Sequence, residues 1–292
     1  MKSGSSRAPR LASGREPRSA VHEANAARNA AGTWRRAVRW RSVRAGLWRL
    51  LECHVAPGAA VAVVGAGNAH DVPLRHLCRR AGRVDLVDLD AAALRRARRR
   101  LIAGRRMVRM VVEDVTHGRA DAITRAALDA RPVPQDWPAP PAPAESYDVV
   151  LADLLFTQVL YPALADAGLP GRLTDSILRH HGQALTQAVV GWLHSSAPAG
   201  VVVHVHDLLG WWPGHPQPFS LDEVLALAEE DVDAAVALAQ RGNVPSGCDP
   251  RRASLALGAQ IVDTTMWRWP FSPGVDFLVC ATVVRSGRFT GG

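Results

Sequence analysis

The sequence predicts an α/β protein whose mostly parallel sheet is covered by helices on both faces. From residue 60 onward, short apolar runs alternate with segments of helical periodicity, which is the pattern of right-handed βαβ units. The first apolar run, residues 61–64, leads through a glycine turn, "GAGNAH", into a helical segment. Such a strand, turn and helix leave backbone N–H groups facing a ligand.

The composition fits a globular protein with a sizeable core. Of the 292 residues, 48% are hydrophobic, and no apolar run reaches the roughly 18 residues that a membrane helix needs. We expect no secretory signal, since the amino-terminal stretch lacks its apolar segment. The four cysteines have no CxxC spacing, which favours reduced thiols in a cytoplasmic protein over disulfides or a zinc site: Cys53, Cys78, Cys248 and Cys280.

Positive charge is concentrated near the amino terminus. Residues 1–54 hold 12 Lys and Arg against three acidic residues, so the remainder is close to neutral. Residues 1–32 have few large apolar side chains, which predicts a disordered basic tail, with an organelle transit peptide as an alternative. In residues 33–56, large apolar residues recur at helical spacing between arginines. This pattern predicts an amphipathic lid helix on the following domain; a membrane surface or a nucleic acid is the alternative partner.

The elements of the main domain, residues 57–290, follow from apolar runs and from the glycines that end helices. We expect strands at 61–64, 84–87, 107–112, 147–152 and 201–206. Helices are expected at 71–81, 91–103, 121–130 and 175–195. Pro73 is tolerated in the first turn of its helix, and Gly82 and Gly104 end the first two helices.

Two insertions interrupt this alternation. Residues 131–146 are proline-rich, which excludes a helix or a central strand and predicts a stiff surface loop. Residues 211–257 form a predicted helical insertion, in which Ser220 and Glu223 have the spacing of a capping box before a helix that runs to about Gln240. Two final runs, 260–271 and 276–285, predict a terminal hairpin of strands.

Acidic residues fall at the ends of three successive predicted strands. Asp88 lies 23 residues after Gly65, where a carboxylate can accept both hydroxyls of a ribose. Asp114 follows the third strand and Asp153 the fourth. Because parallel strands end at one edge of the sheet, these carboxylates are expected to share a ligand site. Helix capping by the same acids is the alternative interpretation.

The glycine turn distinguishes two cofactor classes. A dinucleotide site requires G-x-G-x-x-G, and here His70 stands at the third glycine position, which disfavours an NAD-dependent oxidoreductase. Three carboxylates along one rim of the sheet suit a cationic ligand better than a pyrophosphate.

The order of these motifs resembles the class I S-adenosylmethionine-dependent methyltransferase family. The resemblance covers residues 60–210, and more loosely 258–286, and implies a Rossmann-like, doubly wound seven-stranded sheet with an antiparallel last strand. It also implies S-adenosyl-L-methionine as cofactor. The implied cofactor-binding residues are Gly65, Ala66, Gly67, Asn68, Asp71, Asp88, Leu89, Asp114, Val115 and Asp153.

Two positions depart from the family pattern. The family usually has an acid two residues before the first glycine, where this chain has Val63, and its third loop glycine is here Ala69. We interpret Asp71 as the replacement for the missing acid in binding the ammonium group of the cofactor.

Candidate chemistry lies after the fourth and fifth strands. Methyl transfer depends on positioning, with a base only where the acceptor loses a proton. The candidate catalytic residues are His206, Asp207 and Asp153. Although "HVHD" contains metal-ligand residue types, no further ligands accompany it, so no metal is expected. Candidate substrate contacts are Thr157, Gln158, Tyr161, His180, His181 and Arg268.

Three functions follow in order of preference. The first is methyl transfer to a small-molecule acceptor, and the second is methylation of RNA or another nucleic acid through the basic amino-terminal region. The third is a non-catalytic nucleoside-binding module. The arginine run at 95–100 is interpreted as a solvated helix face, and the "(N/D)PPY" signature of amino-group methylation is absent, which disfavours nucleic-acid bases.

Overall fold

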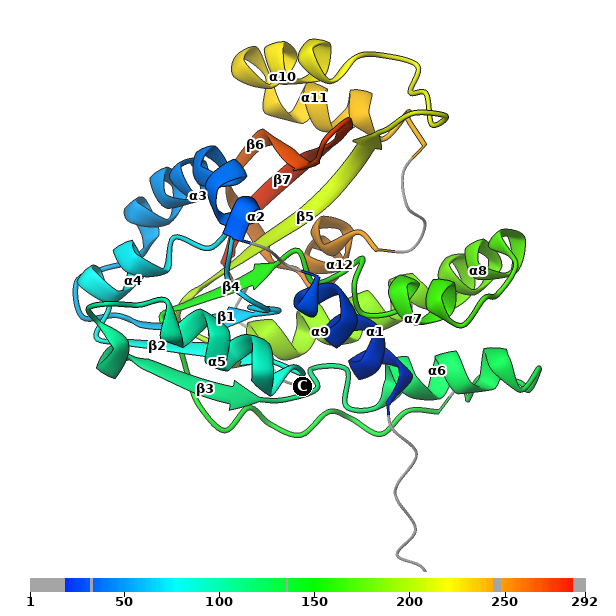
Figure 1. Ribbon diagram of the computed structural model, residues 1–292, viewed down its shortest axis with the longest axis horizontal. Coiled ribbons are helices and arrows are strands. Elements are labelled where there is room, and N and C mark those ends of the chain that lie inside the picture. Colours follow the sequence, from blue (N-terminus) through cyan, green and yellow to red (C-terminus); the bar gives the residue numbers. More distant parts are fainter. Residues whose placement is uncertain (1–18, 32–33, 135, 244–247, 286–292) are drawn as a thin grey trace, which may run out of the picture.

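A single seven-stranded sheet organises the chain. The structure, a computed structural model, describes residues 19–31, 34–134, 136–243 and 248–285. The strands are β1 (Ala60–Val64), β2 (Arg83–Asp88), β3 (Val108–Val112), β4 (Val149–Asp153), β5 (Val201–Trp211), β6 (Gln260–Ser272) and β7 (Val275–Arg285). Their order is β3-β2-β1-β4-β5-β7-β6 (Figure 1), with β1 to β5 parallel and β7 antiparallel to both neighbours. The Rossmann-like methyltransferase fold class expected from the sequence is therefore confirmed.

Helices lie on both faces of the sheet and beyond its carboxyl edge. The helices are α1 (Ala20–Ala30), α2 (Trp34–Arg39), α3 (Arg41–His54), α4 (Leu74–Arg80), α5 (Ala91–Arg99), α6 (Arg119–Leu128), α7 (Tyr161–Asp166), α8 (Gly171–Ile177), α9 (Gln183–Ser196), α10 (Leu221–Glu230), α11 (Val232–Ala239) and α12 (Pro250–Ala256). Helices α3, α4 and α5 pack on one face, and α9 and α12 on the other. None of these described helices is both long and apolar enough to span a membrane.

Alternation along the strands explains the two-sided core. In β1, Val61 and Val63 belong to the cluster under α3, α4 and α5, whereas Ala62 and Val64 belong to the cluster under α9. Successive side chains of a strand point to opposite faces, so a strand that is apolar throughout is buried on both. This is why the central strands read as uninterrupted apolar runs.

Most expected elements are present with shifted ends. The helix expected at 71–81 begins at Leu74, because Pro73 occupies its N-cap. The helix expected at 175–195 is instead α8 and α9, joined by a π-helical turn at Leu178–Gly182. Strand β5 continues five residues past the expected end at 206, through a bulge between Asp207 and Leu209. The capping box of Ser220 and Glu223 is present at the start of α10.

The amino-terminal region requires a correction. Residues 1–32 were expected to be disordered, and residues 1–18 and 32 lie outside the described part, but residues 20–30 form helix α1. Ser19 caps this helix, and Val21 and Ala24 are buried against α6, α7 and α8. The lid helix expected at 33–56 is two helices, α2 and α3, that pack on the domain near β6.

An aromatic cluster attaches α3 to the terminal hairpin. Trp40 is 5% exposed, and its ring centroid lies 5.0 Å from that of Trp269 and 6.2 Å from that of Phe271. The Trp40 indole N–H also donates to the Pro270 carbonyl oxygen at 2.9 Å. Trp269 therefore buries the hairpin against the start of α3.

The proline-rich loop covers part of the sheet in place of a helix. Residues 131–146 run back below β3 from α6 toward β4 (Figure 1). Between this loop and the sheet lies a cavity of about 260 Å³ lined by residues that include Val87, Met110, Tyr147 and Trp192. An extended, proline-stiffened segment cannot interdigitate with the sheet as a helix does, which accounts for the space.

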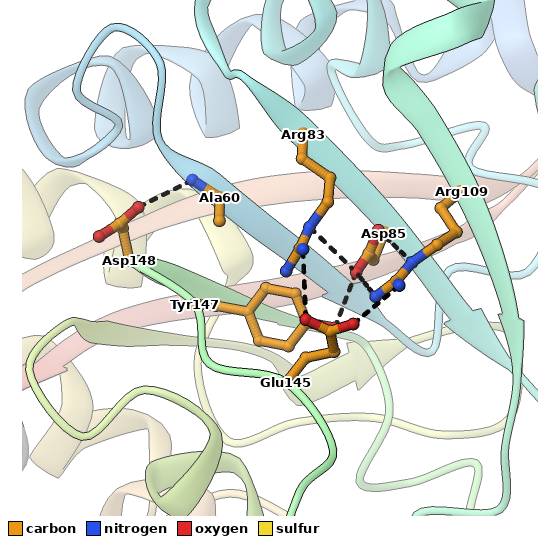
Figure 2. A network of polar contacts seen from close by, with 7 residues as sticks. All are labelled: Ala60, Arg83, Asp85, Arg109, Glu145, Tyr147 and Asp148. Atoms are coloured by element: carbon orange, nitrogen blue, oxygen red, sulfur yellow. Dashed lines mark hydrogen bonds and ion pairs between the residues drawn. The ribbon is translucent and has the colours of Figure 1, made fainter.

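A polar network secures the loop at the amino-terminal ends of β2 and β3 (Figure 2). Asp85 is fully buried and accepts two hydrogen bonds from Arg109, at 3.1 and 2.6 Å, and one from the Tyr147 hydroxyl at 2.8 Å. Glu145 of the loop pairs with Arg109 at 2.8 Å and with Arg83 at 3.2 Å. Each charged side chain of the network has an ion-pair partner, so the network stabilises the fold at the edge of the sheet opposite the expected ligand site.

We predict that Trp40→Ala lowers the free energy of unfolding by about 3 kcal/mol, because it removes a buried aromatic side chain and leaves a cavity. Val38→Ala is the matched control, since Val38 is 64% exposed on the neighbouring helix, and it should change stability by less than about 0.5 kcal/mol. Urea unfolding of both variants measures the difference. Equal stability of the two variants would show that the aromatic cluster does not hold α3 to the hairpin.

Candidate functional site

The glycine turn after β1 is the first component of the candidate site. Gly65 has φ 75° and Gly67 φ 44°, a conformation that glycine adopts without strain. A side chain at Gly65 would begin 3.0 Å from the Asp153 carbonyl oxygen, so glycine also permits the close approach to the end of β4. The N–H groups of Gly65 and Ala66 both donate to the Val87 carbonyl oxygen, which ties the turn to β2.

Arginines hold the second half of the turn. Arg100 donates to the carbonyl oxygens of Asn68 and Ala69, and Arg44 of α3 donates to that of His70. Arg96 donates to the Asn68 side chain at 2.8 Å. Residues 95–100 thus keep exposed arginines, as expected, but Arg96 and Arg100 also bond the turn, from α5 and the residue after it. These hydrogen bonds fix the conformation of the turn, although the third glycine of the family pattern is absent.

His70 belongs to this arginine-rich environment. Its ring lies against Arg100 and edge-on to Trp40, with centroids 6.4 Å apart. Burial, followed by the positive charge of Arg100, lowers the pKa of His70 to about 4. His70 is therefore neutral at physiological pH and fills the position where a dinucleotide site needs glycine.

Asp88 lies at the end of β2 directly beside the glycine turn. One carboxylate oxygen accepts the Gly67 N–H at 2.8 Å, and the other accepts the Asp90 N–H at 2.8 Å. Burial raises the pKa of Asp88, and these two backbone donors act against the shift. Each carboxylate oxygen can accept a second bond, so Asp88 can still receive two hydroxyl groups. The half-buried Leu89 packs toward the cluster formed by α1, α6 and α7.

Asp71, in the loop between β1 and α4, and Asp153, at the end of β4, form a close carboxyl pair. Asp71 is half-buried and Asp153 is 4% exposed. Burial, and then the charge of Asp71, raise the pKa of Asp153 well above its ordinary value. Burial also raises the pKa of Asp71, while Arg44 and Arg100 act in the opposite direction. The raised pKa values favour a proton shared by the pair. A cation bound beside the two carboxyls would instead stabilise their ionised form.

The structure gives Asp114 a role within its own turn. Its carboxylate accepts from the Thr116 N–H at 2.8 Å, the Thr116 hydroxyl at 2.7 Å and the Gly118 N–H at 2.7 Å. Val115 is buried in the cluster under α9. These bonds close the turn between β3 and α6, and they do not cap α6, whose N-cap is Gly118. Contact of Asp114 and Val115 with an adenine remains a prediction.

The end of β5 carries two buried histidines and one half-buried aspartate. His204 and His206 are buried; the His204 Nε2 lies 3.0 Å from the Ser254 hydroxyl, and burial lowers the pKa of His206 to about 4. Asp207 is half-buried and accepts the Thr157 hydroxyl at 2.8 Å, and burial raises its pKa to about 6. Asp207 is thus better suited than His206 to exchange a proton with a ligand. In the described part of the chain, no cluster of metal-ligating side chains forms.

The remaining predicted substrate residues do not converge. Gln158 and Tyr161 are exposed after β4, and Arg268 forms an exposed ion pair with Asp222 of α10 at 2.7 Å. His180 is exposed and His181 half-buried in the π-helical turn. The structure therefore brings Thr157 to the β5 site but uses Arg268 to hold the helical insertion.

The candidate site also includes residues that the sequence did not indicate. Helix α1 lies beside α6 and α7, at the end of the sheet to which β3 and β4 point (Figure 1). Its Asn29 carbonyl oxygen accepts the Asn68 side chain at 2.7 Å, and a Cβ at Gly67 would lie 2.8 Å from the Asn29 Oδ1. No sequence motif marks Asn29 or Arg44, because both come from segments distant along the chain.

No protein-family model matches the chain, and no curated protein matches its sequence. Solved structures of S-adenosylmethionine-dependent methyltransferases are similar to it in fold. One from Methanosarcina mazei has 9% identity and a TM-score of 0.44, covering 81% of this chain and 96% of that one. One from Leishmania major has 12% identity and a TM-score of 0.43, covering 86% and 82%. The complex of DhpI with SAH has 15% identity and a TM-score of 0.41, covering 92% and 96%.

We predict that Asp153→Asn makes stability less dependent on pH. A carboxyl whose pKa is raised on folding contributes stability below its unfolded value of 3.8, and this is lost as pH rises toward the folded pKa. The variant should therefore gain up to about 1.4 kcal/mol per pH unit over the natural chain as pH rises from 5. Urea unfolding at pH 5, 6, 7 and 8 measures the gap.

Asp166→Asn is the control for this experiment. The exposed Asp166 pairs with Arg28 at 2.7 Å, and that pairing lowers its pKa, so its substitution should give a small gap that stays constant above pH 5. A gap for Asp153→Asn that is also constant between pH 5 and 8 contradicts the shared proton.

Proposed function

We propose that the protein is a class I S-adenosyl-L-methionine-dependent methyltransferase that acts on a small-molecule acceptor. The observation that carries this proposal is the Asp71–Asp153 carboxyl pair, which lies with the glycine turn and Asp88 beyond the carboxyl ends of adjacent strands. A ribose acid beside a proton-sharing carboxyl pair fits a nucleoside that bears an ammonium group. A pyrophosphate would instead be repelled by the same carboxylates.

Different residues would bind different parts of the cofactor. Asp88 would accept the ribose hydroxyls, and the Gly65–Asp71 turn would lie against the ligand. Asp71 and Asp153 would hold its ammonium group, which replaces the proton that the two carboxyls share. Arg44 and Arg100 lower the pKa of Asp71, so their positive charge offsets the negative charge that ionisation of the pair produces. When bound, S-adenosylmethionine supplies an electrophilic methyl group for transfer to a nucleophile.

The acceptor would lie beside Thr157 and Asp207. Asp207 is two residues past Val205, the register partner of Asp153, so it is on the strand adjacent to the carboxyl pair. A half-buried carboxylate whose pKa is raised by burial to about 6 can accept a proton from an acceptor hydroxyl or amine. His206 is less suited because it is buried beside Cys280 and close to Asp249 and Arg251 of α12 and its cap.

Three of the six arginines of α2 and α3 are engaged within the domain, which reduces the basic surface open to a nucleic acid. Arg39 donates to the Phe271 carbonyl oxygen, Arg44 to that of His70, and Arg36 lies over the Trp40 and Phe271 rings. The other three are exposed: Arg35, Arg41 and Arg49. A non-catalytic binding module would use the same residues and differs only in the absence of methyl transfer.

Binding of S-adenosylhomocysteine, measured by isothermal titration calorimetry, tests the proposal. The natural chain should bind it, and Asp88→Ala should weaken binding at least about tenfold, because a carboxylate that accepts two hydroxyls is lost. Asp129→Ala, at an exposed aspartate after α6, is the control and should bind as the natural chain does. Binding of NAD without any binding of S-adenosylhomocysteine would refute the proposed function.

Cofactor affinity should also rise with pH. Because the carboxyl pair holds a proton in the free protein, an ammonium group that binds there releases up to about one proton. Calorimetry at pH 7 in two buffers of different ionisation enthalpy measures the release, which should disappear in Asp153→Asn. Proton uptake, or no proton exchange in the natural chain, would place the ammonium group elsewhere.

A further inference from the structure

Helix α1 lies over the glycine turn by a limited set of contacts. Only Val21 and Ala24 are buried, in a small cluster with α6, α7 and α8. The Val21 N–H donates to Asp121 at 3.1 Å, and Arg28 pairs with Asp166 at the exposed outer end. Together with single hydrogen bonds from Asn68 to Asn29 and from Asn25 to Gln158, these are few contacts for a helix, so it can leave its position and return to it.

One face of α1 is polar and touches the candidate cofactor residues. His22, Asn25 and Asn29 lie three and four residues apart, so they share this face. The Asn29 side chain is over Gly67, and His22 is close enough to Asp88 to affect the pKa of its carboxyl. Between them, the Asn25 amide group donates to the Gln158 carbonyl oxygen at 3.4 Å.

Asn25 carries an unsatisfied acceptor on this face. Its Oδ1 is buried and has no hydrogen-bond partner, although its amide nitrogen is bonded to the carbonyl oxygens of Val21 and Gln158. A buried oxygen without a donor is unfavourable, and such groups in native proteins commonly serve a ligand. The ribose hydroxyls, the ammonium and the adenine amino group of a S-adenosyl nucleoside are all donors.

We propose that α1 forms one wall of the cofactor site, with Asn25 Oδ1 accepting a hydrogen bond from the bound S-adenosyl ligand and Asn29 lying against it at Gly67. This assignment rests on the proposed function, since it names the same ligand. Because Asn29 now occupies the space above Gly67, α1 moves aside as the ligand enters and then packs on it. The polar face of α1 thus contacts the ligand at the turn, where the family pattern has a third glycine.

Asn25→Ala and Asn29→Ala, singly and together, test this wall with S-adenosylhomocysteine as the probe. Each single variant should raise the Kd about fivefold and the double variant more, while the Tm of the free protein stays within a few degrees. Ala27→Ser is the matched control, because Ala27 is exposed on the same helix, and it should leave the Kd unchanged.

The outcomes separate this inference from the proposed function. If the natural chain binds S-adenosylhomocysteine and Asp88→Ala abolishes binding, but the double variant binds normally, α1 is only a cover and the inference is wrong. If the natural chain does not bind the ligand, the proposed function itself fails. A double variant that binds more tightly would show that α1 competes with the ligand, which also overturns the inference.

Discussion

The parallel register of β1 with β2 and β4 is the constraint on which the candidate site depends. Val64 pairs with Val87 on one side and with Ala152 on the other, so three chain segments leave the sheet at the same level. The turn after β1, Asp88 and Asp153 meet for that reason alone. Their side chains are then close enough to share hydrogen bonds and a proton, which none of the segments could arrange separately.

The balance of charge at these strand tips follows from two distant segments. Buried carboxyls would repel each other, and the pair is tolerated because it shares a proton and because Arg44 and Arg100 are nearby. Both arginines also bind carbonyl oxygens of the turn, so the groups that offset the acids also fix the loop. This dual use explains how a turn with Ala69, at φ 48°, keeps a conformation that glycine would adopt more easily.

The sequence predicted the sheet well and the site in part. Apolar runs located the strands because burial on both faces leaves a local signal, and strand ends located Asp88 and Asp153. It did not predict α1, because the segment has only Val21 and Ala24 as apolar anchors and their partners lie on α6, α7 and α8. The hydrogen bonds from Arg100 to the glycine turn were not predicted for a similar reason. A run of arginines does not indicate which of them donates to a carbonyl oxygen.

The bulge in β5 determines which polar residues can meet an acceptor. In a regular strand His204 and His206 share one face, and here that face is buried by α12 and α9, where Ser254 bonds His204. The register shift between Asp207 and Leu209 interrupts the alternation. A bulge redirects the side chain beside it. Asp207 accordingly meets Thr157 from the segment after β4, so backbone geometry separates a buried histidine pair from a half-buried carboxylate on the same strand.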